Sequence, residues 1–391
     1  MKKVWQTKKL REVCELVNGR AYSKLELLAA GKYRVLRVGN FFTNDHWYYS
    51  DMELEEKKYC DTGDLLYAWS ASFGPRMWTG GKVIYHYHIW KVVHDRAQID
   101  QKFLFYFFQW DTEKIKEDQG TGTTMMHVSM GSMNERDIHL PPLAEQQRIV
   151  GLLDDAFEGI ATAKANAEKN LQNARALFES HLQSVFTQRG PGWVETTLEK
   201  ATSGVFTGPF GSLLHKHDYV ENGIPLVNPA HITDTGIEPD MRKTVSEDTA
   251  KRLANYIMRE GDVVIGRRGE MGRCALVTEV EDGWLCGTGS FYIKPSDRCD
   301  MGYLVRYLRS EGCRRQLETL AGGAVMPNLS NTALSGLSMF LPPLRKQKEI
   351  VDGIDVLHEE TQRLARLYER KLAALEALKK SLLHQAFAGE L

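Results

Sequence analysis

The sequence predicts an α+β protein in which two similar globular domains are separated by two long antiparallel helices that form a coiled coil, with pseudo-twofold symmetry. Two observations predict this fold class. The segment LPPLAEQQRIV, which begins at residue 140, recurs as LPPLRKQKEIV from residue 341, and each copy opens a stretch whose apolar residues recur at spacings of three and four. The segments ahead of the two copies are also alike, as expected of a duplicated domain.

The duplication defines the domain boundaries. Residues 140–189 align without a gap over residues 341–390, and identical positions include Gln146 with Gln347 and Asp154 with Asp355. Upstream, GDLLYAWSASFG from residue 63 is placed like GDVVIGRRGEMG from residue 261, and RVLRVGNF from residue 34 like PLVNPAHI from residue 225. We therefore divide the chain into a first globular domain (1–139), a first repeat helix (140–189), a second globular domain (190–340) and a second repeat helix (341–391).

Composition fits this division. A chain of 391 residues with 42% hydrophobic residues can bury the cores of two or three domains. The net charge of −1 gives no whole-molecule argument for a polyanionic partner. No apolar run is long enough for a membrane span, the N-terminal MKKVWQTKKL lacks the apolar segment of a signal peptide, and the six cysteines form no C-x-x-C pair. We expect a cytoplasmic protein.

Both globular domains combine β-rich runs with helices. In the first, RVLRV, DLLYAW and KVIYHYHIWKVV are typical of strands, and residues 100–116 predict a helix. In the second, DVVIG and SFYIKP predict strands and residues 301–320 predict a helix. The aromatic residues of NDHWYYSD and YHYHIW are expected to pack in the core and across strands, with base stacking as the alternative.

The two repeat segments predict helices of some forty residues, because Pro-Pro fits a helix entry and the apolar spacing then continues for about five heptads. A globular domain precedes each helix, so the helices can pair side by side only in antiparallel fashion. The predicted seam is Ile149, Leu153, Ala156, Ile160, Ala163, Ala167, Leu171, Ala174, Leu177, Leu182 and Val185 with Ile350, Ile354, Leu357, Leu364, Leu367, Leu375, Leu378, Leu382 and Ala386.

The order of variable domain, LPPLAEQQRIV helix, variable domain and LPPLRKQKEIV helix, closed by HQAFAGEL, resembles the specificity subunit of type I restriction-modification systems. The resemblance implies target-recognition domains that each read half of a bipartite double-stranded DNA site, and helices that set their spacing and dock two copies of a methyltransferase subunit. It also implies a non-catalytic chain without a cofactor of its own. S-adenosylmethionine, ATP and magnesium are expected on partner subunits, which include restriction or translocase subunits where these exist. Because the two domains differ in sequence, an asymmetric site is expected.

Base recognition needs side chains on base edges, with Arg suited to guanine and Asn or Gln to adenine. Polar loops that hold such residues are RVLRVGN, WSASFGPRM, VFTGPFGSLLHKH and GRRGEMGR. The candidate DNA-binding residues are Arg34, Arg37, Asn40, Ser70, Ser72, Arg76, Lys216, Asn228, His231, Arg267, Arg268 and Arg273. The alternative for each is a surface salt bridge or a side chain that stabilises a turn.

The repeat helices carry more apolar residues than one seam requires, which indicates further helices docking on the pair. The candidate partner-binding residues are Phe157, Phe178, Leu182, Phe186, Leu357, Tyr368, Leu383 and Phe387.

Two other classes of function remain open. A coiled-coil scaffold that does not bind DNA could present two protein-interaction heads. An enzyme would need catalytic residues, but no N-P-P-Y, D-P-P-Y or Walker A segment occurs. The E-x-K within EEKK at residue 55 is typical of a solvated charged face, and His86 and His88, placed on a presumed strand, lack a third metal ligand nearby in the sequence. No metal site is expected.

Overall fold

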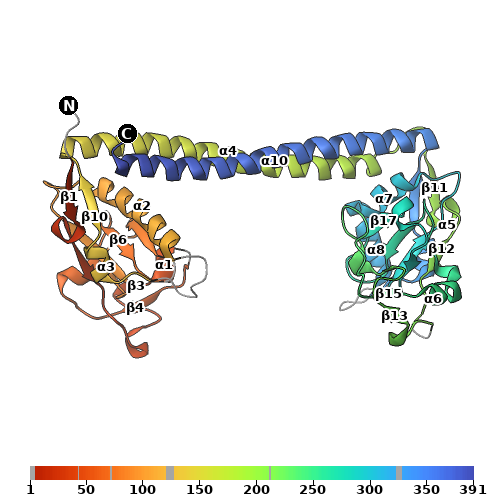
Figure 1. Cartoon of the computed structure of the whole chain (residues 1–391), viewed down its shortest axis with the longest axis horizontal. Coiled ribbons are helices and arrows are strands. Elements are labelled where there is room, and N and C mark those ends of the chain that lie inside the picture. Colours follow the sequence, from red (N-terminus) through yellow and green to blue (C-terminus); the bar gives the residue numbers. More distant parts are fainter. Residues whose placement is uncertain (1–4, 43, 71–72, 120–126, 211–212, 323–327) are drawn as a thin grey trace. The chain divides into compact units, whose positions relative to one another are not determined.

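The computed structural model describes residues 5–42, 44–70, 73–119, 127–210, 213–322 and 328–391 (Figure 1). The chain divides into two compact units. Unit 1 consists of Met1–Glu168 with Glu369–Leu391, and unit 2 consists of Lys169–Tyr368. Each unit therefore holds one globular domain together with segments of both repeat helices.

Unit 1 is built on two four-stranded sheets. One is fully antiparallel in the order β2-β9-β6-β7, and the other has the order β4-β3-β8-β5 with β3 and β8 parallel. A separate antiparallel pair joins β1 to β10. The strands are β1 (Gln6–Lys9), β2 (Cys14–Asn18), β3 (Tyr33–Leu36), β4 (Tyr48–Ser50), β5 (Tyr59–Cys60), β6 (Leu65–Ala68), β7 (Gly74–Met77), β8 (Val83–Tyr85), β9 (Ile89–His94) and β10 (Asp137–Leu140).

The helices of unit 1 include α2, whose buried aromatic residues pack into the main core with the first sheet. The predicted helix at 100–116 is confirmed by α2. The predicted run KVIYHYHIWKVV is two strands that belong to different sheets, and His86 to His88 form the turn between them. The helices are α1 (Val38–Phe42), α2 (Gln101–Gln119) and α3 (Met130–Asn134), with short 3-10 turns at Leu10–Glu12, Lys24–Glu26 and Glu56–Lys58.

Unit 2 repeats this plan. Its main sheet is antiparallel in the order β12-β19-β16-β17, β14 lies parallel to β18, and β11 pairs with β20. The strands are β11 (Val194–Thr197), β12 (Val205–Thr207), β13 (Tyr219–Val220), β14 (Leu226–Val227), β15 (Thr244–Val245), β16 (Val263–Gly266), β17 (Cys274–Leu276), β18 (Leu285–Cys286), β19 (Ser290–Ile293) and β20 (Ser338–Leu341). The two domains are therefore copies of one α+β fold, as predicted.

The helix predicted at 301–320 is broken in two. The hydroxyl of Ser310 accepts a hydrogen bond from the backbone N–H of Cys313, so Ser310 caps a new helix. The helices of unit 2 are α5 (Leu198–Ala201), α6 (Glu247–Arg252), α7 (Met301–Arg309), α8 (Glu311–Ala321) and α9 (Asn331–Ser335), with 3-10 turns at Lys216–Asp218, Pro229–His231, Ala254–Tyr256 and Glu279–Glu281.

The repeated segments form α4 (Leu143–Thr187) and α10 (Leu344–Ala388), each a continuous helix of 45 residues. In unit 1, Lys164 Nζ lies 2.6 Å from Glu376 Oε1, while Arg148 donates to the carbonyl of Leu391 at 2.8 Å. Residue numbers rise along one helix as they fall along the other, so the pairing is antiparallel, as predicted. In unit 2, the ring of Phe178 lies 4.9 Å from that of His358.

A buried glutamine ties each repeat helix to its own domain. Gln347 Oε1 accepts from the N–H of Asp300 at 2.7 Å, and its Nε2 donates to the carbonyls of Arg298 at 2.9 Å and Pro342 at 2.8 Å. The equivalent Gln146 makes the same three kinds of bond in unit 1, with Asp100, Gln98 and Pro141. The repeated L-P-P-L-x-x-Q segment is thus the junction between domain and helix.

A second shared contact lies two turns further along each helix. Asp154 accepts hydrogen bonds from Lys102 at 2.7 Å and from the hydroxyl of Tyr106 at 2.6 Å. Asp355 takes the same place in unit 2, where it is bound by the guanidinium of Arg306. In both units the carboxylate holds the helix that follows the main sheet against the repeat helix.

The far ends of the repeat helices also pack into these domains. In unit 1 the ring of Phe387 lies 5.1 Å from Phe103 and 5.8 Å from Phe107. In unit 2 the ring of Phe186 lies 5.4 Å from Tyr303 and 5.6 Å from Tyr307. The end of α10 therefore makes an aromatic contact with the first globular domain, and the end of α4 makes one with the second.

Not every predicted seam residue is buried. Leu177, Leu367 and Leu378 are large apolar residues that face solvent, with exposed fractions of 54%, 45% and 47%. The reason is geometric, because two helices that pair along one stripe leave the residues outside that stripe exposed. In the described part of the chain, no helix has both the length and the hydrophobicity that a membrane span requires.

Candidate nucleic-acid interface

In unit 1, several loops meet where strands β2, β6 and β8 end and β9 begins, and backbone hydrogen bonds join them. Trp69 N donates to His88 O at 3.1 Å and Val128 N donates to Trp69 O at 3.0 Å. The loop after β2 joins the same place, since Arg20 N donates to Tyr85 O at the end of β8 at 3.0 Å and Tyr87 N, in the turn between β8 and β9, donates to Arg20 O at 3.1 Å. We call this loop cluster 1, and its members are Gly19, Arg20, Arg37, Trp69, Ser70, His86, Tyr87, His88 and His127.

Unit 2 holds the corresponding cluster with the same backbone connections. Arg267 N donates to Gly289 O at 2.9 Å, and Leu329 N donates to Arg267 O at 2.9 Å. The isolated bridge between Ser70 and His127 recurs as one between Arg268 and Asn328. We call this loop cluster 2, and its members are Gly208, Asn228, Arg267, Arg268, Gly287, Thr288, Gly289 and Asn328.

Each cluster depends on a glycine where two backbones approach closely. A Cβ at Gly19 would lie 2.2 Å from Tyr85 O, and one at Gly208 would lie 1.9 Å from Gly287 O. Both distances are below any real Cβ contact, so only glycine fits either position. Gly19 N donates to Ile89 O at 3.2 Å, and Gly208 N donates to Ser290 O at 3.0 Å. These bonds place the loop after β2 and the loop after β12 in equivalent positions.

Loop cluster 1 combines imidazoles with arginines. Burial, together with the neighbouring His88 and Arg37, lowers the pKa of His86 to about 4, and burial and Arg37 also lower the pKa of His88. Both rings are therefore neutral at neutral pH and can accept as well as donate hydrogen bonds. Arg20 forms an ion pair with Glu26 at 2.6 Å, yet its Nη1 atom is buried and has no partner among the described residues.

Loop cluster 2 contains two adjacent arginines. Arg268 is exposed, and its Nε lies 3.3 Å from Asn328 Oδ1. Arg267 is half-buried, and within the described residues its buried Nε has no acceptor. Burial and the charge of Arg268 lower the pKa of Arg267 from its ordinary value. A guanidinium that is partly removed from water and lacks an acceptor is unfavourable by itself, so it favours a ligand that brings one.

The predicted DNA-binding residues divide into two groups. Members of the loop clusters are Arg37, Ser70, Asn228, Arg267 and Arg268. Lys216 is exposed on the 3-10 turn that follows Gly208 in the chain. Ser72 lies outside the described residues.

The other predicted residues are held by contacts within their own units. The guanidinium of Arg34 donates to Gly80 O and lies over the Trp47 ring, that of Arg76 donates to Phe41 O, and the Asn40 amide donates to the carbonyls of Asn44 and His46. In unit 2, Arg273 pairs with Glu270 at 2.7 Å, and His231 Nδ1 lies 2.9 Å from Leu226 O. A base contact by any of these side chains would first require that an existing bond break. In the structure these residues make the ion-pair or turn-stabilising contacts that are the alternative to DNA binding.

Sequence reasoning missed Arg20, Trp69, His86 and His88 as members of the interface. A signal was present, because VNGRAYS at residue 17 corresponds to FTGPFGS at residue 206 through the two essential glycines. The sequence predicts that His86 and His88 lie on a strand, without a third ligand for a metal ion. They lie instead in the β8–β9 turn, and no three metal-ligand side chains come together in the part of the chain that the structure describes.

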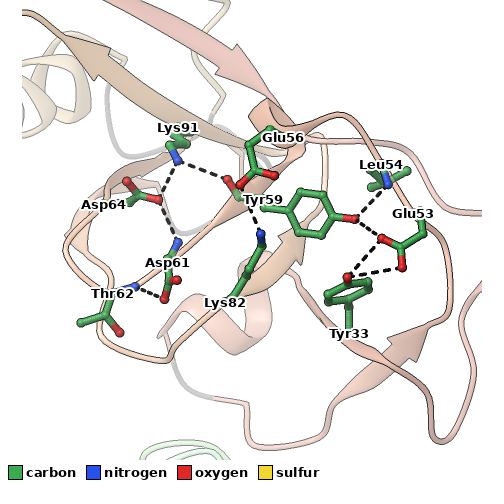
Figure 2. A network of polar contacts seen from close by, with 10 residues as sticks. All are labelled: Tyr33, Glu53, Leu54, Glu56, Tyr59, Asp61, Thr62, Asp64, Lys82 and Lys91. Atoms are coloured by element: carbon green, nitrogen blue, oxygen red, sulfur yellow. Dashed lines mark hydrogen bonds and ion pairs between the residues drawn. The ribbon is translucent and has the colours of Figure 1, made fainter.

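Glu56 of the EEKK segment lies in a network of polar contacts on the first domain (Figure 2). Glu56 accepts from Lys82 at 3.2 Å, beside the Tyr59 ring, and Lys57 pairs with Glu55 at 3.2 Å. Lys58 donates to Asn18 O at 2.8 Å. The lysines and glutamates neutralise one another on an exposed surface, as predicted for a solvated charged face.

The predicted partner-binding residues are mostly used within the chain. Leu182, Leu383 and Phe387 are buried, and Phe387 is only 2% exposed. Phe157 packs on Tyr106 at 5.4 Å, and Phe186 packs on the α7 tyrosines. Leu357, Tyr368 and Phe178 are partly exposed. These side chains are therefore largely used within the chain, because the end of each repeat helix packs on the globular domain of the unit in which it ends.

Comparisons with known proteins bear on the whole chain. A family model described as the type I restriction modification DNA specificity domain matches residues 2–172 and 211–370. The type I restriction enzyme EcoBI specificity subunit of Escherichia coli is 20% identical, over 99% of this chain and 86% of its own length. The MjaVIII specificity subunit of Methanocaldococcus jannaschii is 22% identical, over 84% of this chain and 79% of its own length.

Solved structures show the same fold. The HsdS subunit from Thermoanaerobacter tengcongensis superposes with a TM-score of 0.66 at 21% identity, over 99% of this chain and 97% of that one. A chain from a study of complex assembly and conformational transition in a type I R-M system gives a TM-score of 0.76 at 20% identity, over 99% of this chain and 98% of that one. The curated relatives are named as specificity subunits, which is the non-catalytic role that the sequence predicts. The two matched segments cover most of the sequence and both duplicated domains, so the chain belongs to the family of type I restriction-modification DNA specificity subunits.

Proposed function

We propose that this chain selects the DNA target of a type I restriction-modification complex, with loop cluster 1 reading one half of an asymmetric bipartite site and loop cluster 2 reading the other. The observation that carries the proposal is a pair of buried guanidinium atoms, Arg20 Nη1 and Arg267 Nε, which have no partner among the described residues and lie in equivalent loop clusters of two duplicated domains. Base edges and phosphates supply the acceptors that these groups lack.

The differences between the clusters support an asymmetric target. Cluster 1 presents imidazoles and aromatic rings, while cluster 2 presents arginines and glycines at the same backbone positions. Two surfaces with one scaffold and different donors and acceptors match different base sequences. A duplicated domain with two identical surfaces would instead fit a palindromic site.

The repeat helices supply the surface for partners. Leu177 and Leu378 occupy equivalent places in the repeat and are both about half exposed, unlike the buried ends of the helices. Since the two places are equivalent, we propose that they dock two copies of one methyltransferase subunit. S-adenosylmethionine would bind to those subunits, and ATP with magnesium to restriction or translocase subunits where these are present.

The test is to map modified bases in host DNA with and without this gene, and to select bound sequences from a random DNA library with the chain assembled with its methyltransferase. We expect a bipartite, asymmetric motif whose modification requires the gene. The double variant Arg267→Gln with Arg268→Gln should alter selection at one half only. Arg242→Gln is the matched control, because Arg242 is exposed and pairs with Asp240 away from the loop cluster. A scaffold that does not bind DNA would give no motif at all.

A further inference from the structure

Residues 69 and 267 have different side chains but the same backbone hydrogen bonds in the two loop clusters. Trp69 and Arg267 are equivalent. Each donates its backbone N–H to the turn before β9 or β19, and each accepts at its carbonyl from the N–H of Val128 or Leu329. These two backbone hydrogen bonds fix the position of the Cα atom of residue 69 or 267. The two side chains can therefore be compared directly.

Beneath each of these side chains lies an aromatic ring from the neighbouring strand. In unit 1 the indole of Trp69 is stacked on Trp90, with ring centroids 6.0 Å apart and planes inclined by 20°. In unit 2 the Cζ of Arg267 lies 5.3 Å from the centre of the Phe291 ring. Trp90 pairs with Tyr67 and Phe291 pairs with Ile265, which are equivalent residues of β6 and β16. We call Trp90 and Phe291 the platform rings.

The platform rings are themselves held in place by packing. Trp90 is almost wholly buried and stacks on Tyr67, while Phe291 is buried in the core of unit 2. A planar group held against such a ring loses much of its freedom before any ligand binds, and geometric readout of a base requires this restriction. A contact to a phosphate, which is a diffuse charge, requires no such restriction.

The two planar groups offer different contacts. The Nε of Arg267 has no acceptor among the described residues, and the geometry of a guanidinium fits the O6 and N7 acceptors of guanine in the major groove. Trp69 has no donor left, because its Nε1 donates to Tyr87 O at 2.8 Å. The remainder of its half-buried ring is apolar carbon, which matches the methyl group of thymine.

We propose that residues 69 and 267 determine specificity in their half-sites, with Arg267 selecting a guanine and Trp69 selecting a thymine at the corresponding position. This inference rests on the proposed function, since it assigns single bases within sites that the two loop clusters read. Arg268, exposed beside Arg267, is the better placed of the two for a phosphate.

The experiment is selection from a random DNA library with the assembled complex, scored base by base in both half-sites. Arg267→Lys keeps the charge but loses the planar set of donors, and Arg267→Gln loses both. Each should reduce the preference for guanine at one position at least about tenfold and leave the other half-site unchanged. Retained base preference at the other positions of the same half-site shows that unit 2 of the variant is folded. Arg273→Lys is the control from the same turn, because Glu270 already binds that guanidinium.

The exchange Trp69→Arg tests the equivalence in the other direction. It should replace thymine by guanine at one position of the other half-site. An unchanged base preference in the Arg267 variants, or a uniform loss of affinity seen with Gln but not with Lys, would overturn the assignment, the latter by showing a phosphate contact. If the unmodified complex selects no bipartite motif, the proposed function fails as well, so the two failures are distinguishable.

Discussion

The buried glutamine at the start of each repeat helix gives a quantitative prediction. Gln347 is fully buried and makes three hydrogen bonds, to the N–H of Asp300 and to the carbonyls of Arg298 and Pro342. Gln347→Leu keeps a side chain of similar size and removes all three bonds. Each net contribution is about 1 kcal/mol, and the backbone groups of Asp300, Arg298 and Pro342 lose this partner. We expect a loss of about 3 kcal/mol in the stability of the junction.

The measurement is native-state hydrogen exchange at Asp300, whose amide is the donor in the first of these bonds. A loss of about 3 kcal/mol corresponds to roughly a hundredfold faster exchange if local opening controls the rate. Gln362→Leu is the matched control, since Gln362 is exposed on the same helix, and it should change the stability by less than about 0.5 kcal/mol. Equal exchange rates in the two variants would refute the role of Gln347 as the tie between domain and helix.

Three further outcomes are expected. Phe387→Ala should destabilise unit 1 by about 3–5 kcal/mol in chemical denaturation, because it empties a buried aromatic site, and an effect as small as that of Leu378→Ala would contradict this. Leu177→Asp with Leu378→Asp should leave the chain stable but weaken methyltransferase binding at least tenfold by titration, whereas unaltered binding would place the docking surface elsewhere. Unit 1 should become less stable between pH 7 and pH 5, because burial lowers the pKa of His86 to about 4 while the unfolded chain takes up the proton near pH 6.5. The urea midpoint of His86→Asn should fall less over this range, and a midpoint that rises on acidification would contradict the sign.

The architecture could be predicted because its signal is repeated and long. The two helices follow from an apolar period sustained over many turns, and the similarity of the domains follows from the duplicated segments ahead of them. Local departures came from short-range chemistry. Ser310 ends one helix by capping the next, and the turn at His86 divides one apolar run between two sheets.

The candidate site was predicted only in part, because sequence indicates which residue types suit DNA but not which are already occupied. Arg34, Asn40 and Arg76 have the side chains that base recognition requires, yet each bonds to a nearby backbone carbonyl. Trp69 has the opposite character. The sequence places it in the polar loop WSASFGPRM but does not select it as a DNA-binding residue, and its place in the candidate interface follows from the backbone bonds that make it the counterpart of Arg267.

The pattern of similarity within the chain has a physical explanation. The residues that the two halves share, such as Gln146 with Gln347 and Asp154 with Asp355, make the same contacts between a helix and the domain preceding it. Identical structural tasks require identical side chains. Trp69 and Arg267 keep the same backbone bonds but differ in side chain. We propose that they differ because their contacts lie outside the protein, where the two halves of an asymmetric site present different atoms. On this reasoning, divergence at a position whose backbone bonds are unchanged marks a surface that meets a ligand.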